Sequence, residues 1–218
     1  MDPSRYATTT FKAKINGEAT LADLLLSDVR AEECIQHTEM GDIIASDDLL
    51  LYDDKVNELI QNKKKYGILK EKCAMIEHMY DYIIIDTPPT NSIFLGNALS
   101  YADKVIIPTT PDVYGIAGLM DVPKLIEYYR KYNPYMSIIG VLIVKYRKYK
   151  YSEGSILEIE KFVKENLETT VFKTRVRESV RCAEALGYGL PLQKYAPKCN
   201  TAIDYMNFTK EFLVRERQ

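Results

Sequence analysis

Two patterns of hydrophobic and polar positions alternate along the chain. Residues 82–85, 104–108 and 137–145 are apolar runs with almost no polar interruption, which is typical of strands covered on both faces in a parallel sheet. Between them, apolar residues recur at helical spacing, as in segment 115–132, where Pro123 is expected to bend the helix. Strands separated by helices of this length predict right-handed crossovers and an α/β fold, a mainly parallel sheet flanked by helices.

The same patterns and their capping residues place the remaining elements. Thr20 is expected to cap a short helix, and Asp47 or Asp48 the next one. The full set of further predictions is helices at 21–26, from 47 or 48 to about 60, at 68–78, 92–102, 155–166, 178–186 and 202–215, and short strands at 41–47 and 170–172.

Length and composition describe one ordinary globular domain over residues 1–218, with 46% hydrophobic and 28% charged residues. The four cysteines are widely scattered and only two histidines occur, so neither a zinc site nor a disulfide framework is indicated. The N-terminal residues lack the apolar core of a signal peptide, and no apolar run approaches membrane-spanning length. These features predict a soluble, cytoplasmic protein with no membrane partner.

The charge is uneven along the chain. The overall net charge is -2, but the segment from Lys145 to the end holds 15 Lys and Arg against 10 Asp and Glu, which makes it net +5 and the remainder net -7. A basic end on a mildly acidic protein favours an anionic partner, although a solvated helix surface gives the same count.

Asp86 stands at the end of the apolar run 82–85, and Pro88 and Pro89 stop the strand there because they lack amide donors. Ligands of open α/β sheets bind beyond the carboxyl ends of the strands, so a carboxylate at this point is placed to meet a bound ion or phosphate. The alternative is a structural one, in which Asp86 caps the helix that starts near Asn91.

Three segments in order carry a family resemblance. Y-D-Y-I-I-I-D-T-P-P-T-N at 80–91, with the following L-G-N-A-L-S-Y-A-D-K-V-I-I-P-T-T-P-D, resembles the Walker B region of the ParA/Soj partition ATPases, members of the MinD/ParA superfamily. V-F-K-T-R-V-R-E-S-V-R-C-A-E-A at 171–185 and the residues after it are similar to that family's C-terminal region, and D-P-S-R-Y-A-T-T-T-F at the start resembles its D-P-Q-G-N-A-T segment. The resemblance covers nearly the whole chain.

The resemblance implies a P-loop NTPase-like fold that binds ATP and magnesium. It implies that Asp86 holds the magnesium shell, usually through water, and that Asp2 positions the attacking water. It also implies ATP-dependent dimerisation, nonspecific DNA binding, a ParB-like partner protein and association with the nucleoid.

One part of the family pattern is absent from the 218 residues. Members carry a glycine-rich K-G-G-x-G-K-T loop that binds the phosphates, but here no glycine lies in a G-x-x-x-x-G-K-[ST] pattern and no Gly-Lys dipeptide occurs. The corresponding strand, loop and helix unit, on the order of 30 to 40 residues, is expected to be missing. Whether this chain is itself an enzyme is therefore left open, and we expect neither ATP hydrolysis nor tight nucleotide binding.

The candidate DNA-binding residues are basic and lie in the last third of the chain. The resemblance places them at Arg175, Arg177, Arg181, Lys194, Lys198 and Lys210, with a solubilising surface as the alternative. A second basic and aromatic run, K-Y-R-K-Y-K-Y at 145–151, could contact phosphates and bases, but it also fits a solvated loop after a strand. V-R-E at 176–178 replaces the I-P-R of many relatives, so the nucleotide-facing role of that turn does not carry over.

Two classes of function are open after this reading. In the first, the chain is a ParA/Soj-like partition protein shortened at its start. In the second, it is a non-catalytic module that binds DNA, a partner protein or a full-length relative. A third reading, D-T-P-P-T as the D-P-P-Y element of adenine methyltransferases, lacks the aromatic residue that stacks on the base and a glycine-rich loop for the methyl donor.

Overall fold

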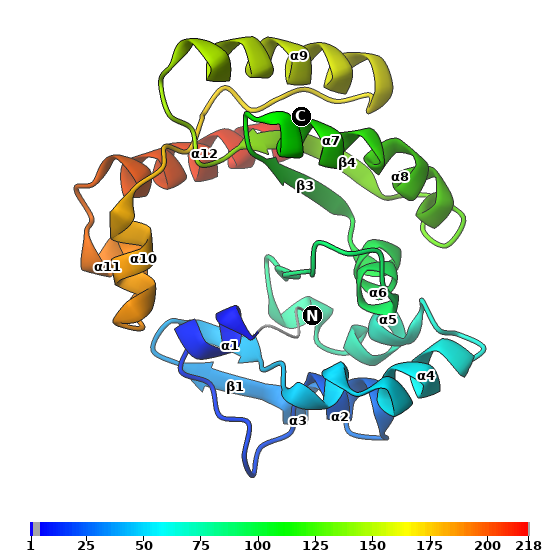
Figure 1. Ribbon diagram of the computed structural model, residues 1–218. Helices are drawn as coiled ribbons and strands as arrows, with labels where there is room; N and C mark the ends of the chain where they lie inside the picture. The colour runs from blue at the N-terminus through cyan, green and yellow to red at the C-terminus, as the bar shows by residue number, and fades with distance from the viewer. Residues whose placement is uncertain (2–4, 218) are drawn as a thin grey trace. The chain divides into compact units, whose positions relative to one another are not determined.

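The computed structural model describes residue 1 and residues 5–217, and the chain divides into two units. The first unit comprises Met1–Ala102 and Tyr132–Pro134, and the second comprises Asp103–Lys131 and Tyr135–Gln218. Figure 1 shows the course of the chain through both. Each unit is described by itself.

The first unit is mainly helical, with one small antiparallel hairpin. Its elements are α1 (Tyr6–Thr10), α2 (Leu21–Leu26), α3 (Ala31–Cys34), β1 (Ile35–Thr38), β2 (Gly41–Ile44), the 3-10 helix η1 (Asp48–Leu51), α4 (Asp53–Gln61), α5 (Ile68–Cys73), the 3-10 helix η2 (Glu77–Met79) and α6 (Ile93–Tyr101).

Capping groups explain where several of these helices begin. Thr20 and Asp23 form a capping box at the start of α2, as the sequence indicated. Asp47 accepts from the backbone of Leu49 and starts η1, and Ser92 accepts from Leu95 and starts α6. Apolar side chains of α2, α4, α5 and α6 then form one core.

A buried asparagine ties helices of the first unit together. The Asn97 side chain, 1% exposed, accepts from the amide of Leu69 at 3.1 Å and donates to the carbonyl oxygens of Lys65 and Ile93 at 2.6 and 3.0 Å. These bonds join α6 to the start of α5 without leaving the amide unpaired.

The second unit contains the parallel sheet. Its elements are β3 (Lys104–Thr109), α7 (Val113–Met120), α8 (Val122–Arg130), β4 (Ser137–Ile143), α9 (Lys150–Asn166), α10 (Val180–Gly187), α11 (Leu192–Tyr195) and α12 (Asn200–Glu216). β3 pairs with β4 in parallel, and residues 171–177 run beside β4 with single parallel bridges at Val171 and Arg177.

Alternate residues of β4 face two different helical layers. Val141 and Ile143 pack with α7 and α9, whereas Leu142 packs with Phe172 and with aromatic side chains of α12. The sheet is thus covered on both faces, which explains the apolar run in the sequence. The sequence predicted one helix over 115–132 that bends at Pro123. The structure instead has two helices, α7 and α8, with Pro123 in the first turn of α8.

One predicted strand is wrong. Residues 82–85 belong to neither sheet, since each sheet has two strands and none of them includes this run. A strand is held by ladder bonds to a neighbour, and the described part of the chain offers it no such neighbour. The predicted helix 68–78 also differs, because it ends at Cys73 and only the short η2 follows.

Among the residues that the structure describes, no helix has both the length and the apolar character needed to cross a membrane.

Candidate functional site

Asp86 lies in the first unit, directly after the apolar run 82–85, and it is exposed to solvent. Its carbonyl oxygen accepts a hydrogen bond from the terminal ammonium of Met1 at 2.8 Å. Within residues 1 and 5–217, no group of three or more His, Cys, Asp or Glu side chains is arranged to hold a metal ion. Asp2, the second candidate, lies outside the described residues.

A cavity of about 430 Å³ opens beside the run that ends at Asp86. Most of its lining is apolar, from α1, the β1–β2 hairpin, α5 and residues 82–85. Two further charged residues reach it, Arg5, which is paired with Asp48 at 2.9 Å, and Asp42, which binds His37 and Tyr80. This chemistry suits an apolar polypeptide segment better than a triphosphate, which needs many donors.

The carboxyl end of β3 forms a tight turn in the second unit. Asp112 accepts from the amide of Gly115 at 2.9 Å and caps α7, and this backbone hydrogen bond is the main reason that the pKa of Asp112 lies below its ordinary value. Gly115 is required there, because a Cβ atom would lie 2.0 Å from the carbonyl oxygen of Thr110. The positive charge of Lys145, past the end of β4, also lowers the pKa of Asp112. Periodicity alone did not single out these two residues.

The three candidate arginines are all bound to carboxylates. Arg177 makes a bidentate contact with Asp204, Nε to Oδ2 at 2.8 Å and Nη2 to Oδ1 at 2.7 Å, and its backbone amide donates to Oδ2 at 3.0 Å. Arg181 pairs with Glu184 at 2.7 Å. Arg175 binds two glutamates of α9.

Arg175 belongs to a cluster at the end of β4. It contacts Glu153 at 3.1 Å and Glu160 at 3.8 Å, and its guanidinium lies over the ring of Tyr146. The Tyr146 hydroxyl donates to Glu153, and this hydrogen bond raises the pKa of Tyr146. The cluster joins α9 to the segment after β4.

The Arg177–Asp204 pair differs from the ion pairs of Arg175 and Arg181 because its carboxylate is buried. Asp204 is 6% exposed, and burial alone would raise its pKa. The hydrogen bonds and the charge of Arg177 outweigh burial and hold the pKa below its ordinary value. The pair therefore fastens residue 177 to α12.

The three candidate lysines differ from the arginines. Lys194 on α11, Lys198 after it and Lys210 on α12 are all exposed. Within the described part of the chain, none of them lies within ion-pair distance of a carboxylate. Their charges face solvent.

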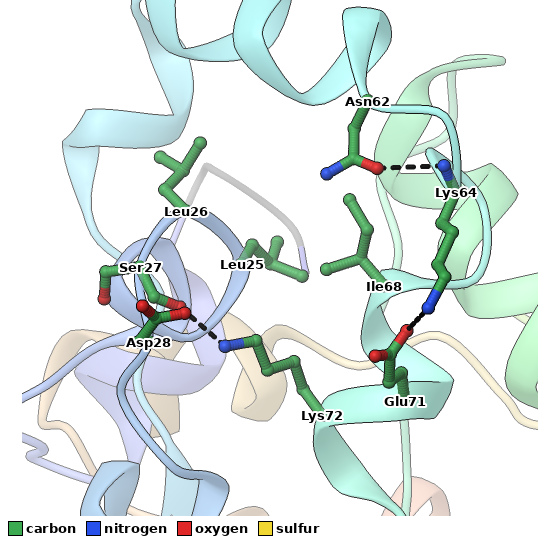
Figure 2. Close-up of a pocket in the computed structure, with 9 residues that line it drawn as sticks. All are labelled: Leu25, Leu26, Ser27, Asp28, Asn62, Lys64, Ile68, Glu71 and Lys72. Atoms are coloured by element: carbon green, nitrogen blue, oxygen red, sulfur yellow. Dashed lines mark hydrogen bonds and ion pairs between the residues drawn. The ribbon is translucent and has the colours of Figure 1, made fainter.

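A second cavity, of about 400 Å³, was not predicted (Figure 2). Leu25, Leu26 and Ile68 form its apolar part, as the close-up shows. Lys64 binds Glu71 at 2.7 Å and Lys72 donates to the carbonyl oxygen of Ser27 at 2.6 Å, so both ammonium groups at its rim are occupied. Asp28 and Glu71 balance the two lysines, which leaves no net charge to attract an anion.

Comparison with known proteins decides the family. Residues 1–138 match the AAA domain family. The chain belongs to this family, as a ParA-type member. The Bacillus subtilis sporulation initiation inhibitor protein Soj is 27% identical over 214 residues, covering 97% of this chain and 83% of Soj. The chromosome partitioning protein ParA of Caulobacter vibrioides is 28% identical over 204 residues, covering 91% and 74%.

Solved structures show the same fold. A variant of the Cyanothece protein McdA, in complex with ATP, has a TM-score of 0.79 at 21% identity and covers 99% of this chain and 81% of that one. The ParA-type recognition and the α/β P-loop NTPase-like fold are thus confirmed. Asp86 lies in the first unit of this ParA-type chain and the six basic candidates lie in the second. Their roles remain predictions.

Proposed function

We propose that this ParA-type chain serves in DNA partition and contacts DNA without sequence preference through lysines of its second unit. The proposal rests on which basic side chains form ion pairs with carboxylates and which do not. Lys194, Lys198 and Lys210 are exposed and unpaired by carboxylates among the described residues, whereas the three arginines are engaged in ion pairs. A chromosome partitioning protein among the relatives supports the same reading.

Free positive charge is what nonspecific binding uses. A lysine that neutralises a phosphate releases a condensed counterion, and each such contact adds about 0.9 to the slope of log affinity against log salt on duplex DNA. An arginine already paired with a carboxylate has to give up that partner first. The lysines are therefore the first positions to test.

The experiment measures binding of a labelled random-sequence duplex by fluorescence anisotropy across a salt series. The variant replaces Lys194, Lys198 and Lys210 by alanine, and the control replaces Lys124, Lys161 and Lys164, three exposed lysines of the same unit that make the same change in net charge. We expect the first triple variant to weaken binding and flatten the salt slope by up to about 3 units, and the control to do much less. Equal effects in both variants would reject the lysine site, and salt-independent binding would reject the electrostatic proposal.

The 218 residues do not fit a tightly held Mg-ATP. Among the described residues, Asp86 belongs to no group of three or more His, Cys, Asp or Glu side chains that could hold a metal ion, and the cavity beside it is mostly apolar. The sequence also holds no glycine-rich phosphate loop. We propose that this chain, as printed, does not hydrolyse ATP and binds it no more tightly than about 1 mM.

Nucleotide binding is tested by titrating a fluorescent ATP analogue with magnesium, and turnover by phosphate release. Binding in the micromolar range, or turnover that Asp86→Ala abolishes, would overturn this part. Fusing a strand and a K-G-G-x-G-K-T loop from a relative to the N-terminus is expected to create binding that depends on Asp86, because loop amides and a lysine supply most of the phosphate contacts.

A second candidate function is a non-catalytic module that works with a full-length relative or a ParB-like partner protein. The apolar cavity beside residues 82–85 favours it, since it offers a surface that another polypeptide could cover. In either case we place the protein in the cytoplasm, associated with the nucleoid. Mixing the purified chain with a full-length relative and measuring ATPase activity and co-elution separates the two functions.

A further inference from the structure

Two tyrosines of the second unit stack on each other. The rings of Tyr188 and Tyr195 have centroids 5.5 Å apart and an interplanar angle of 24°. Tyr188 directly follows α10 and Tyr195 ends α11, and these two helices lie side by side (Figure 1). Tyr195 is partly buried, whereas Tyr188 is 70% exposed. Tyr188 is therefore the outer layer of the stack, with a ring that contacts Tyr195 and is otherwise largely open to solvent.

Hydrogen bonds hold the two rings in place. The amide of Tyr188 donates to the carbonyl oxygen of Glu184 at 3.0 Å, and the chain then reverses at Gly189, which has a φ of 60°. The Tyr195 hydroxyl donates to Oε2 of Glu184 at 3.1 Å, and Arg181 donates to the same oxygen at 2.7 Å. A ligand that contacts Tyr188 thus meets a preorganised ring, which lowers the entropy cost of binding.

Free positive charge lies close to this aromatic pair. The segment 179–199 has three basic residues against one acidic residue and is net +2: Arg181, Lys194 and Lys198 against Glu184. Arg181 is occupied by Glu184, but within the described part of the chain neither lysine lies within ion-pair distance of a carboxylate. Lys194 directly precedes the inner tyrosine, and Lys198 follows it by three residues, which span at most about 11 Å.

An open aromatic ring beside free ammonium groups matches an unpaired nucleotide. Bases of single-stranded nucleic acid stack on aromatic side chains while basic side chains bind the phosphates, and this stacking is tolerant of sequence. A duplex cannot use the ring of Tyr188 in this way unless a base leaves the helix, which costs free energy. An apolar peptide would use the ring but would gain nothing from Lys194 and Lys198. The combination favours single-stranded nucleic acid.

We propose that Tyr188, supported by Tyr195, is a stacking platform for one unpaired DNA base, whose neighbouring phosphates are bound by Lys194 and Lys198. This site deepens the proposed function and rests on it, since the same lysines contact the phosphates of duplex DNA. It adds single-stranded DNA as a ligand, with a contact to the base that binding of a duplex does not use.

The test compares two strands that differ only in their bases. Fluorescence anisotropy measures binding of a labelled oligothymidylate of about 20 nucleotides and of an abasic strand of the same length and phosphate charge. The lysines act equally on both strands, because the phosphates are the same. We expect the protein to bind the oligothymidylate about 5-fold to 150-fold more tightly, the range that one stacked base contributes.

Three variants assign this difference to the ring. Tyr188→Ala is expected to reduce the affinity for oligothymidylate to that for the abasic strand, and to leave duplex binding unchanged. Tyr188→Phe keeps the ring and should keep the preference. Tyr135→Ala, at a residue 88% exposed in the same unit, is the matched control and should change nothing. Circular dichroism checks that each variant is folded.

A crosslink locates the base in the unchanged protein. An oligonucleotide that carries 5-iodouracil in place of thymine is irradiated in the complex, and mass spectrometry identifies the modified residue. We expect the crosslink at Tyr188. This measurement decides the site even where a variant fails to fold, and a crosslink confined to other residues would overturn the proposal.

Three further outcomes overturn it. They are equal affinity of the protein for the two strands, a preference that folded Tyr188→Ala retains, and a preference that appears with oligouridylate but not with oligothymidylate. Failure of the proposed function gives a different pattern, in which the triple lysine variant keeps its duplex binding. Failure of the platform alone leaves that lysine dependence intact and removes only the preference for bases.

Discussion

Replacing Arg177 by alanine should destabilise the protein far more than an ordinary surface arginine would. Asp204 is 6% exposed and loses its two side-chain hydrogen bonds in this variant, keeping only the one from the amide of residue 177. Breaking a buried ion pair by removing one partner costs about 3 to 5 kcal/mol. The Arg177 side chain is 43% exposed, so water can reach part of the space it leaves, and we expect about 2 to 3 kcal/mol.

The loss of stability in Arg177→Ala should depend on pH. The pKa of Asp204 is lowered in the folded protein, so the pair stabilises it above the unfolded pKa of about 3.9 and the contribution is lost as pH falls through the folded value. In Arg177→Ala, only the hydrogen bond from the amide of residue 177 still opposes the effect of burial, so we expect the pKa of Asp204 to rise and the variant to lose most stability at neutral pH. The stability difference between the two proteins should therefore shrink as the pH falls from about 7 to about 4.

The assay is urea unfolding followed by circular dichroism at both pH values, since the chain has no tryptophan. Arg181→Ala is the control, because Arg181 and Glu184 form an exposed pair three residues apart, and such pairs contribute little to stability. A double variant with Asp204→Asn should recover part of the loss. The reasoning is wrong if Arg177→Ala costs no more than the control, or if its cost is the same at both pH values.

Two further predictions use the same unfolding assay. Asn97→Ala should cost about 2 to 4 kcal/mol, because it leaves the buried amide of Leu69 without its acceptor; Asn207→Ala on exposed α12 is the control, and equal costs would contradict this. Arg215→Lys should cost about 1 to 3 kcal/mol, because lysine cannot replace the planar contacts to Val171 and to the carboxylate four residues earlier; a neutral result would show that the contacts carry no net energy.

Several helix starts and the strands β3 and β4 of the second unit followed from the sequence. Thr20 and Asp47 were predicted to start helices and do so, and Pro123, predicted to bend a helix, lies in the first turn of α8. These predictions hold because capping and proline effects act within a few residues. The β1–β2 hairpin was not predicted as a pair. Gln36 and His37 give the β1 segment a polar sequence that does not predict a strand. Gly41 has a φ of 116°, but its role at the hairpin turn is clear only when the pairing of β1 with β2 is known.

Charge pairing could not be predicted from the same sequence. The basic count of the last third includes Arg175 and Arg177, whose carboxylate partners lie far along the chain, such as Asp204, 27 residues from Arg177. A count of charges treats bound and free groups alike. Only the fold shows that Arg175 is bound by α9 and Arg177 by α12, while the three lysines face solvent. This moves the expected DNA contacts to the lysines.

The run 82–85 carries the strongest disagreement between sequence and structure. Its four apolar residues are typical of a strand that is buried on both faces, yet Ile84 is 90% exposed. Exposure of a full isoleucine costs about 2 kcal/mol relative to burial, so a covered state is favoured whenever a partner strand is present. A fused phosphate-loop strand would cover this run from within one chain. Its fusion should therefore slow hydrogen exchange at the amides of residues 83–85 as it creates nucleotide binding, and unchanged exchange there would show that the run is not the site that the strand covers.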